Sequence, residues 1–235
     1  MTRADSGSSH PIGTLNEGPL HAGLKAWYAQ PGDESEVGVD GFIIDIVRGR
    51  QLVEIQTAGF STIRDKLRTL VAGYPLRLVY PLAREKWIVR LSEDGQNQIG
   101  RRKSPKRGRL EEIFWELVSF PELVAHPNFC LEVLLIQEEE ARRYKGGRAW
   151  RRRGWITQER RLLQVLDSHL FEQPADVASL LPDGLAEPFT TAELAQAAGI
   201  PRRLAQKMAY CLRKMAAIDV AGKAGRAVLY ARRAV

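Results

Sequence analysis

Apolar positions in the first 142 residues repeat with the period of a helix in some stretches and of a strand in others. Leu20, Leu24 and Trp27 recur at i, i+4 and i+7, which predicts a helix over about 16–29. In chain order, the further predicted elements are strands at 41–47 and 52–57, a helix near 61–70, strands at 76–81 and 86–91, a helix at 110–124 and a strand at 129–137. This order predicts an α/β fold with a mixed sheet flanked by helices.

The C-terminal part has a mostly helical pattern that ends in two short strands. The segment "TQERRLLQVLDSHLF" (157–171) is amphipathic and predicts a helix. A capping box from Thr190 to Glu193 opens a second helix, which ends at Gly199, and Pro201 starts a third. Two strands around a glycine-containing turn follow. Helix, tight turn, helix and hairpin in this order predict a winged helix-turn-helix.

Charge runs indicate where these two parts meet. The acidic run 138–140 precedes the basic, glycine-containing stretch "RYKGGRAWRRRGW", which predicts a domain boundary. The predicted organisation is a flexible tail at 1–13, an α/β domain at 14–142, a basic linker at 143–155 and a winged-helix domain at 156–235.

The composition, with 44% hydrophobic and 27% charged residues, is that of an ordinary globular protein. No run of about 18 apolar residues and no signal-peptide segment is present, so we expect a cytoplasmic protein without a membrane partner. Cys130 and Cys211 lie far apart in apolar surroundings, which favours buried free thiols. The four histidines are scattered, which argues against a zinc enzyme.

The net charge of +7 and the pI near 9.6 favour an anionic partner, most commonly a nucleic acid. A basic protein without a polyanionic partner is the alternative that total charge leaves open. Two basic loops are predicted, at 101–109 and 143–155, and a further basic surplus lies in the C-terminal part.

Two acids and a glutamine interrupt the apolar strands 41–47 and 52–57. Gly49 in the first position of a two-residue loop predicts a type II′ turn, which sets Asp45 opposite Glu54. Gln56 then shares the face of Glu54. Two such close carboxylates repel unless a cation or proton intervenes, and Mg²⁺ or Mn²⁺ prefers oxygen ligands of this kind. The alternative is a solvated outer face, although apolar residues on both sides favour a covered strand pair.

Two further acids are candidates near this hairpin. Glu17 lies three positions before Leu20, on or beside the buried face of the first helix, where a metal would supply a partner. As the alternative, Glu17 complements the helix dipole in the first turn. Asp40 faces away unless a bulge at Gly41 turns it, so it is a second-choice ligand.

A helix carrying Glu17, then "IDIV", a hairpin and "LVEIQT" resembles the PD-(D/E)XK nuclease superfamily of restriction enzymes and Holliday-junction resolvases. The resemblance covers about residues 15–91. It implies a restriction-endonuclease-like mixed sheet and Mg²⁺-dependent hydrolysis of phosphodiesters. Glu17, Asp45 and Glu54 match the acids of the motif, and the carbonyl of Ile55 would join them around the ion.

The sequence departs from that motif at two positions. Ile44 replaces the proline, and Gln56 stands where the family most often has a lysine. In these terms Gln56 would position the attacking water without supplying a charge. Lys66, on the apolar side of the following helix, could reach in to restore the cation, but we expect it to extend its amine to solvent at the edge of that face.

Basic residues of the C-terminal part and of the first basic loop are the predicted DNA contacts. They are Arg202, Arg203, Gln206, Lys207, Arg213 and Lys214 on the third C-terminal helix, Lys223 and Arg226 at the wing, and Arg101, Arg102, Lys103, Lys106 and Arg107 in the loop. The alternatives are a helical protein-interaction module for the former set and a solvated loop for the latter.

Together these patterns predict a metal-dependent DNA endonuclease that a winged helix targets to duplex or branched DNA, in repair, recombination or defence. The rival is a catalytically inactive DNA-binding or regulatory protein on a nuclease fold. A third interpretation is an RNA-directed nuclease in which the winged helix forms a homodimer.

Overall fold

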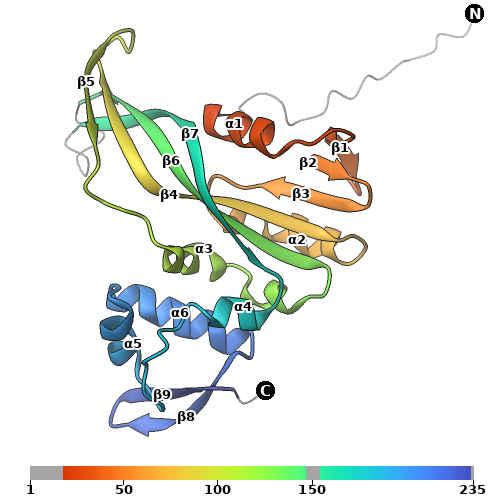
Figure 1. The fold of residues 1–235 in the computed structure, drawn as a ribbon, viewed down its shortest axis with the longest axis vertical. Coiled ribbons are helices and arrows are strands. Elements are labelled where there is room, and N and C mark those ends of the chain that lie inside the picture. The colour runs from red at the N-terminus through yellow and green to blue at the C-terminus, as the bar shows by residue number, and fades with distance from the viewer. Residues whose placement is uncertain (1–17, 147–153, 234–235) are drawn as a thin grey trace, which may run out of the picture.

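One mixed sheet forms the centre of the protein, and the computed structural model describes residues 18–146 and 154–233 (Figure 1). The seven strands of this sheet follow the order β1-β2-β3-β4-β6-β7, with β5 paired to β4, and β8 pairs with β9 separately. The elements are α1 (Pro19–Tyr28), β1 (Glu34–Val39), β2 (Phe42–Arg48), β3 (Gln51–Ile55), η1 (Phe60–Thr62), α2 (Arg64–Val71), β4 (Leu76–Leu91), β5 (Gln98–Lys103), η2 (Leu110–Ile113), α3 (Phe114–Leu117), η3 (Pro121–Ala125), β6 (Phe129–Tyr144), β7 (Trp155–Phe171), α4 (Pro174–Ala178), α5 (Thr191–Ala198), α6 (Arg202–Lys214), β8 (Ile218–Ala224) and β9 (Ala227–Arg232). The predicted α/β fold with a mixed sheet flanked by helices is confirmed.

Apolar cores cover both faces of the sheet. Strands β3, β4 and β6 run parallel, and such strands need cover on both faces. Leu78 belongs to the core that also holds Leu67 of α2, whereas the next residue, Val79, belongs to the core that holds Leu24 of α1. Because successive side chains of a strand point to opposite faces, α1 and α2 lie on opposite sides of the sheet.

Strand β7 replaces the helix that the amphipathic pattern predicts at 157–171, so that prediction is wrong. The pairing of β6 with β7 shifts register at three places, which leaves Gln158, Leu163 and Leu166 as extra residues on β7. Leu162 and Val165, on either side of the bulge at Leu163, both pack against the core beside α1 although they are three positions apart, a spacing typical of a helix. The linker predicted at 143–155 instead connects two paired strands, since Tyr144 pairs with Trp155.

Four further predicted elements differ from the structure. The strands predicted at 76–81 and 86–91 are one strand, β4, with a bulge between Ala83 and Glu85. The helix predicted at 110–124 consists of the short pieces η2, α3 and η3. The basic loop predicted at 101–109 begins as strand β5, so Arg101, Arg102 and Lys103 lie in the sheet.

The C-terminal helices pack under the sheet rather than apart from it (Figure 1). Leu204, Met208, Leu212 and Met215 form the predicted apolar stripe of α6, and all four are buried in the same core as Leu67 of α2. The capping box of Thr190 with Glu193 opens α5, which ends at Gly199 with φ of 61°, as predicted. No described helix combines the length and the apolar character that a membrane crossing requires.

Candidate active site and nucleic-acid interface

The β2–β3 hairpin forms with the predicted register. Arg48 pairs with Gln51, Val47 with Leu52 and Ile46 with Val53. Gly49 has φ of 59°, and Arg50 does not adopt a positive φ. A type II′ turn requires this combination, with a positive φ at its first central residue alone. The two-residue turn therefore sets which residues of β2 and β3 lie side by side.

The ladder ends one pair before the predicted pair of Asp45 with Glu54. Asp45 instead uses its side chain as the acceptor for β3, because its Oδ2 accepts a 2.8 Å hydrogen bond from the backbone N–H of Ile55. The same oxygen lies 3.1 Å from Nε2 of His21 on α1. The carboxylate of Asp45 is thus held where the two strands separate, between the sheet and α1.

Glu54 is a buried acid whose carboxylate meets a lysine of α2. The residue is 6% exposed, and its Oε1 lies 2.6 Å from Nζ of Lys66. That amine also donates to the backbone carbonyl of Ile43, at 2.6 Å. The other oxygen, Oε2, is buried without a hydrogen-bond partner among the described residues. Burial of such an oxygen costs free energy unless something else binds it.

The electrostatics of Glu54 couple it to three neighbours. Burial, followed by the charge of Asp45, raises the pKa of Glu54 to about 7, against the opposing effects of Lys66 and His21. Burial and a second carboxylate favour the protonated form of an acid, whereas a nearby cation favours the ionised form. Asp45, Glu54, Lys66 and His21 therefore form one electrostatic unit, which we call the hairpin site.

The predicted members of this site have different outcomes. Asp45 and Glu54 are brought together. Gln56 is not aimed at them, because its amide donates to the carbonyl of Gly59 and to Thr62 Oγ1, at 3.1 and 3.2 Å. Asp40 occupies the β1–β2 turn with φ of 48°, away from the site, and Glu17 lies outside the described residues.

Two members were missed or misjudged from the sequence. Lys66 does not extend to solvent as expected: its side chain is 15% exposed and ion-paired with Glu54. His21 was not a candidate, although in the helix predicted over 16–29 it follows Glu17 by four positions and would share its face. That spacing is the signal that points to it.

The carboxylate oxygens of the hairpin site are ligands that suit a hard divalent ion. No group of three or more histidine, cysteine, aspartate and glutamate side chains converges within the described ranges. A Mg²⁺ ion tolerates this, because it retains several waters and needs only one or two carboxylates. The buried, unpaired Oε2 of Glu54 beside Asp45 is the observation that fits such an ion.

A cleft of about 410 Å³ lies beyond the carboxyl end of β3, beside the part of β4 that continues past it. Its lining includes Lys86 of β4, Arg142 of β6, Arg160 of β7, Lys106 and Trp115. The guanidinium of Arg160 donates to the carbonyl of Thr57, which follows Glu54 by three residues. The cleft therefore borders the segment that leaves the hairpin site.

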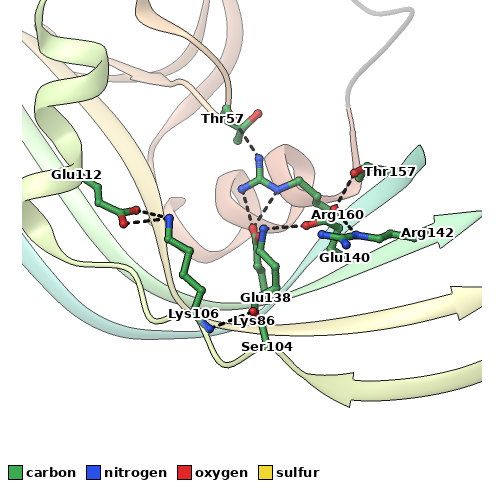
Figure 2. A network of polar contacts seen from close by, with 10 residues as sticks. All are labelled: Thr57, Lys86, Ser104, Lys106, Glu112, Glu138, Glu140, Arg142, Thr157 and Arg160. Carbon is green, nitrogen blue, oxygen red and sulfur yellow. Dashed lines mark hydrogen bonds and ion pairs between the residues drawn. The ribbon is translucent and has the colours of Figure 1, made fainter. Parts of the chain in front are cut away.

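Buried ion pairs form the floor of this cleft. Glu138 is fully buried and accepts two hydrogen bonds from Arg160, at 2.6 and 3.0 Å. Lys86 lies 2.8 Å from Glu138 and 2.7 Å from Glu140 (Figure 2). Burial alone would raise the pKa of Glu140, but hydrogen bonds from Arg142, Lys86 and Thr157 lower it to about 2.

The basic residues predicted to contact DNA divide into two groups. Those of the second half are mainly at the surface: Arg202, Arg203, Gln206, Arg213 and Lys214 of α6 and Lys223 and Arg226 beside the β8–β9 turn are exposed, and Lys207 is half-buried. Those of the first half are largely ion-paired. Arg101 donates to Glu139, Lys103 and Arg107 pair with Glu85, and Lys106 pairs with Glu112.

A family model with the description "Domain of unknown function (DUF8091)" matches residues 18–172. The chain belongs to this family. The DUF8091 match begins just before α1 and ends one residue after β7, so it includes every strand of the large sheet, the hairpin site and the cleft floor. An "Uncharacterized protein" of Treponema pallidum (strain Nichols) is 32% identical over 222 residues, which cover 93% of this chain and 86% of that protein. No solved structure matches this chain.

Proposed function

We propose that this DUF8091 protein is a metal-dependent DNA endonuclease of the PD-(D/E)XK type. The observation that carries the proposal is the amine of Lys66, which lies 2.6 Å from the carboxylate of Glu54 in the hairpin site. The sequence motif lacks its usual lysine at Gln56, and Lys66 supplies a cation at the same carboxylate from the next helix. Two acids and one lysine therefore lie together at the end where this strand pair separates.

In this proposal each side chain of the hairpin site has one task. Asp45, Glu54 and the carbonyl of Ile55 would hold Mg²⁺ or Mn²⁺, with Glu17 as a further candidate ligand. When bound, such an ion acidifies a water molecule and offsets charge that develops on the phosphate. Lys66 orients that water and stabilises negative charge, and His21 keeps the carboxylate of Asp45 in place.

The C-terminal elements support delivery of this site to DNA by a winged helix. Helices α5 and α6 meet across a tight turn at Gly199, and the β8–β9 hairpin follows. The exposed cations of α6 and of the hairpin turn, Lys223 and Arg226, would contact phosphates. Cytoplasmic repair, recombination or defence are the settings in which such a nuclease would act.

The alternative is a catalytically inactive DNA-binding or regulatory protein that retains the nuclease fold. Two observations favour it: Lys66 already neutralises one oxygen of Glu54, and Gln56 is bonded to its own loop. In that case the ion pair serves only to stabilise a buried acid.

Cleavage assays separate these functions. The purified full chain is incubated with branched, linear duplex and single-stranded DNA in Mg²⁺, in Mn²⁺ or in EDTA. We expect metal-dependent products from the wild type and none from Asp45→Asn or Glu54→Gln, with DNA binding retained in both variants. If the wild type and both variants bind DNA but are equally inert on every substrate, the inactive protein is the correct assignment.

A further inference from the structure

Two exposed aromatic side chains lie beside lysines at the junction of α3 and α6. Trp115 is 39% exposed and Tyr210 is 40% exposed. Nζ of Lys207 lies 5.5 Å from the ring centroid of Trp115, and Nζ of Lys214 lies 6.0 Å from that of Tyr210. Proteins that bind single-stranded nucleic acid use exposed aromatic rings next to cations, because the bases stack on the rings and the cations attract the phosphates.

A groove of about 460 Å³ runs between these helices. Its described lining consists of Val118, Arg203, Gln206, Lys207 and Tyr210, with two cations and no carboxylate. Arg203, Lys207 and Tyr210 are separated by four and three positions, so they follow one side of α6. This groove therefore offers positive charge and an aromatic ring along one line.

The contact between Lys207 and Trp115 joins this groove to the 410 Å³ cleft. Lys207 lines the groove, and Trp115 lines the cleft. The lining of the cleft also includes Arg160, which donates to the carbonyl of Thr57, three residues after Glu54. The surface thus leads from α6, past Trp115, to the loop beside the hairpin site.

One edge of α6 borders α3. Lys207 lies over Trp115, and Val118 lines the same groove. A single flexible strand can follow this edge between the two helices, whereas a recognition helix has to place its polar face in a major groove about 12 Å wide.

We propose that the α3–α6 groove binds single-stranded nucleic acid, with bases stacked on Trp115 and Tyr210 and phosphates at Arg203 and Lys207. The proposal rests on the nucleic-acid part of the function proposed above and names the form of substrate. In this proposal α6 contacts a single strand and does not enter the major groove of a duplex. A strand bound in this way would run toward the loop that follows Glu54.

Binding of a labelled oligothymidylate of about 15 nucleotides tests this proposal. Fluorescence anisotropy is measured with the full chain in EDTA, so that no cleavage occurs. We expect Trp115→Ala and Tyr210→Ala each to weaken binding by about ten-fold or more, the effect of one lost base stack. Trp115→Phe and Tyr210→Phe retain a ring and should bind within about three-fold of wild type.

Two exposed aromatic residues elsewhere provide matched controls. Trp27, 50% exposed on α1, and Tyr144, 47% exposed at the end of β6, should tolerate substitution by alanine without loss of binding. Equal affinity of Trp115→Ala, Tyr210→Ala and both control variants would overturn the proposal. Thermal melting checks folding; should Trp115→Ala not fold, the comparison of Tyr210→Ala with Tyr210→Phe decides.

A duplex of the same length distinguishes this inference from the proposed function. If the wild type binds the duplex more tightly than the single strand, the groove assignment fails while the nuclease proposal stands. If it binds neither form at low salt, both proposals fail. Tighter single-strand binding that depends on both rings supports the groove.

Discussion

Glu140 provides a quantitative test of the ion-pair network beneath the cleft. Its carboxylate is 4% exposed and accepts hydrogen bonds from Thr157, Lys86 and Arg142 at 2.6, 2.7 and 2.8 Å. Replacement by glutamine keeps the size of the side chain but removes the charge that these donors stabilise. The change therefore isolates the electrostatic contribution of one buried carboxylate.

The pKa of Glu140 gives the expected magnitude. The hydrogen bonds overcome burial and lower the pKa from 4.5 to about 2. One pKa unit corresponds to about 1.4 kcal/mol, so the folded state gains about 3 kcal/mol from this group at neutral pH. Because the folded pKa lies below the unfolded one, this stabilisation is present above the unfolded pKa and disappears as pH falls toward 2.

Urea unfolding of the wild type and Glu140→Gln at two pH values measures this effect. We expect Glu140→Gln to lower the free energy of unfolding by about 3 kcal/mol near pH 7 and by only about 2 kcal/mol near pH 3.5. Glu139→Gln, which removes a partner of Arg101 at the surface, should cost less than about 1 kcal/mol at either pH. A pH-independent loss in Glu140→Gln would show that packing, rather than charge, carries the contribution.

Further predictions concern the hairpin site and one tight backbone contact. Lys66→Met should lower the cleavage rate by about 100-fold or more in single-turnover assays while leaving DNA affinity unchanged, and an unchanged rate would remove Lys66 from the chemistry. Gln56→Lys should not increase cleavage, because the side chain at this position is directed to Gly59 and Thr62 rather than to Glu54; a clear gain of rate would contradict that geometry. Gly108→Ala should lower the free energy of unfolding by about 1–3 kcal/mol, since its Cβ would lie 2.4 Å from the carbonyl oxygen of Ala83. Gly38→Ala, with open space around its Cβ, should stay within about 0.5 kcal/mol in the same urea titration.

Local chemistry made the hairpin predictable from sequence. A glycine in the first position of a two-residue turn fixes the register within a few residues, and the pairs from Arg48–Gln51 to Ile46–Val53 follow from it. The apolar stripe of α6 and the cap of α5 are predictable for the same reason, because their signals lie within one or two turns of helix.

Elements that depend on distant partners were not predictable in this way. Strand β7 has the apolar spacing of a helix because its bulges are set by its pairing with β6, which the sequence of β7 does not contain. The C-terminal helices likewise have a distant partner in Arg109, which donates to the carbonyls of Ala198 and Gly199, about ninety residues along the chain. A linker predicted from charge runs cannot reveal such contacts.

Contacts between distant segments also decide which residue the proposed activity depends on. From the sequence, the lack of a motif lysine makes Gln56 the residue on which cleavage depends. The structure makes Lys66 the cation nearest the acids, because α2 packs its apolar face against the sheet and so carries the amine to Glu54. A lysine on a separate helix reaches the carboxylate when packing places it at the right position along the helix axis. Its distance in sequence from the strand acid is therefore not fixed. In the proposed nuclease, cleavage at the hairpin site therefore depends on Lys66. We expect Lys66→Met to lose cleavage and Gln56→Lys to cleave like the wild type.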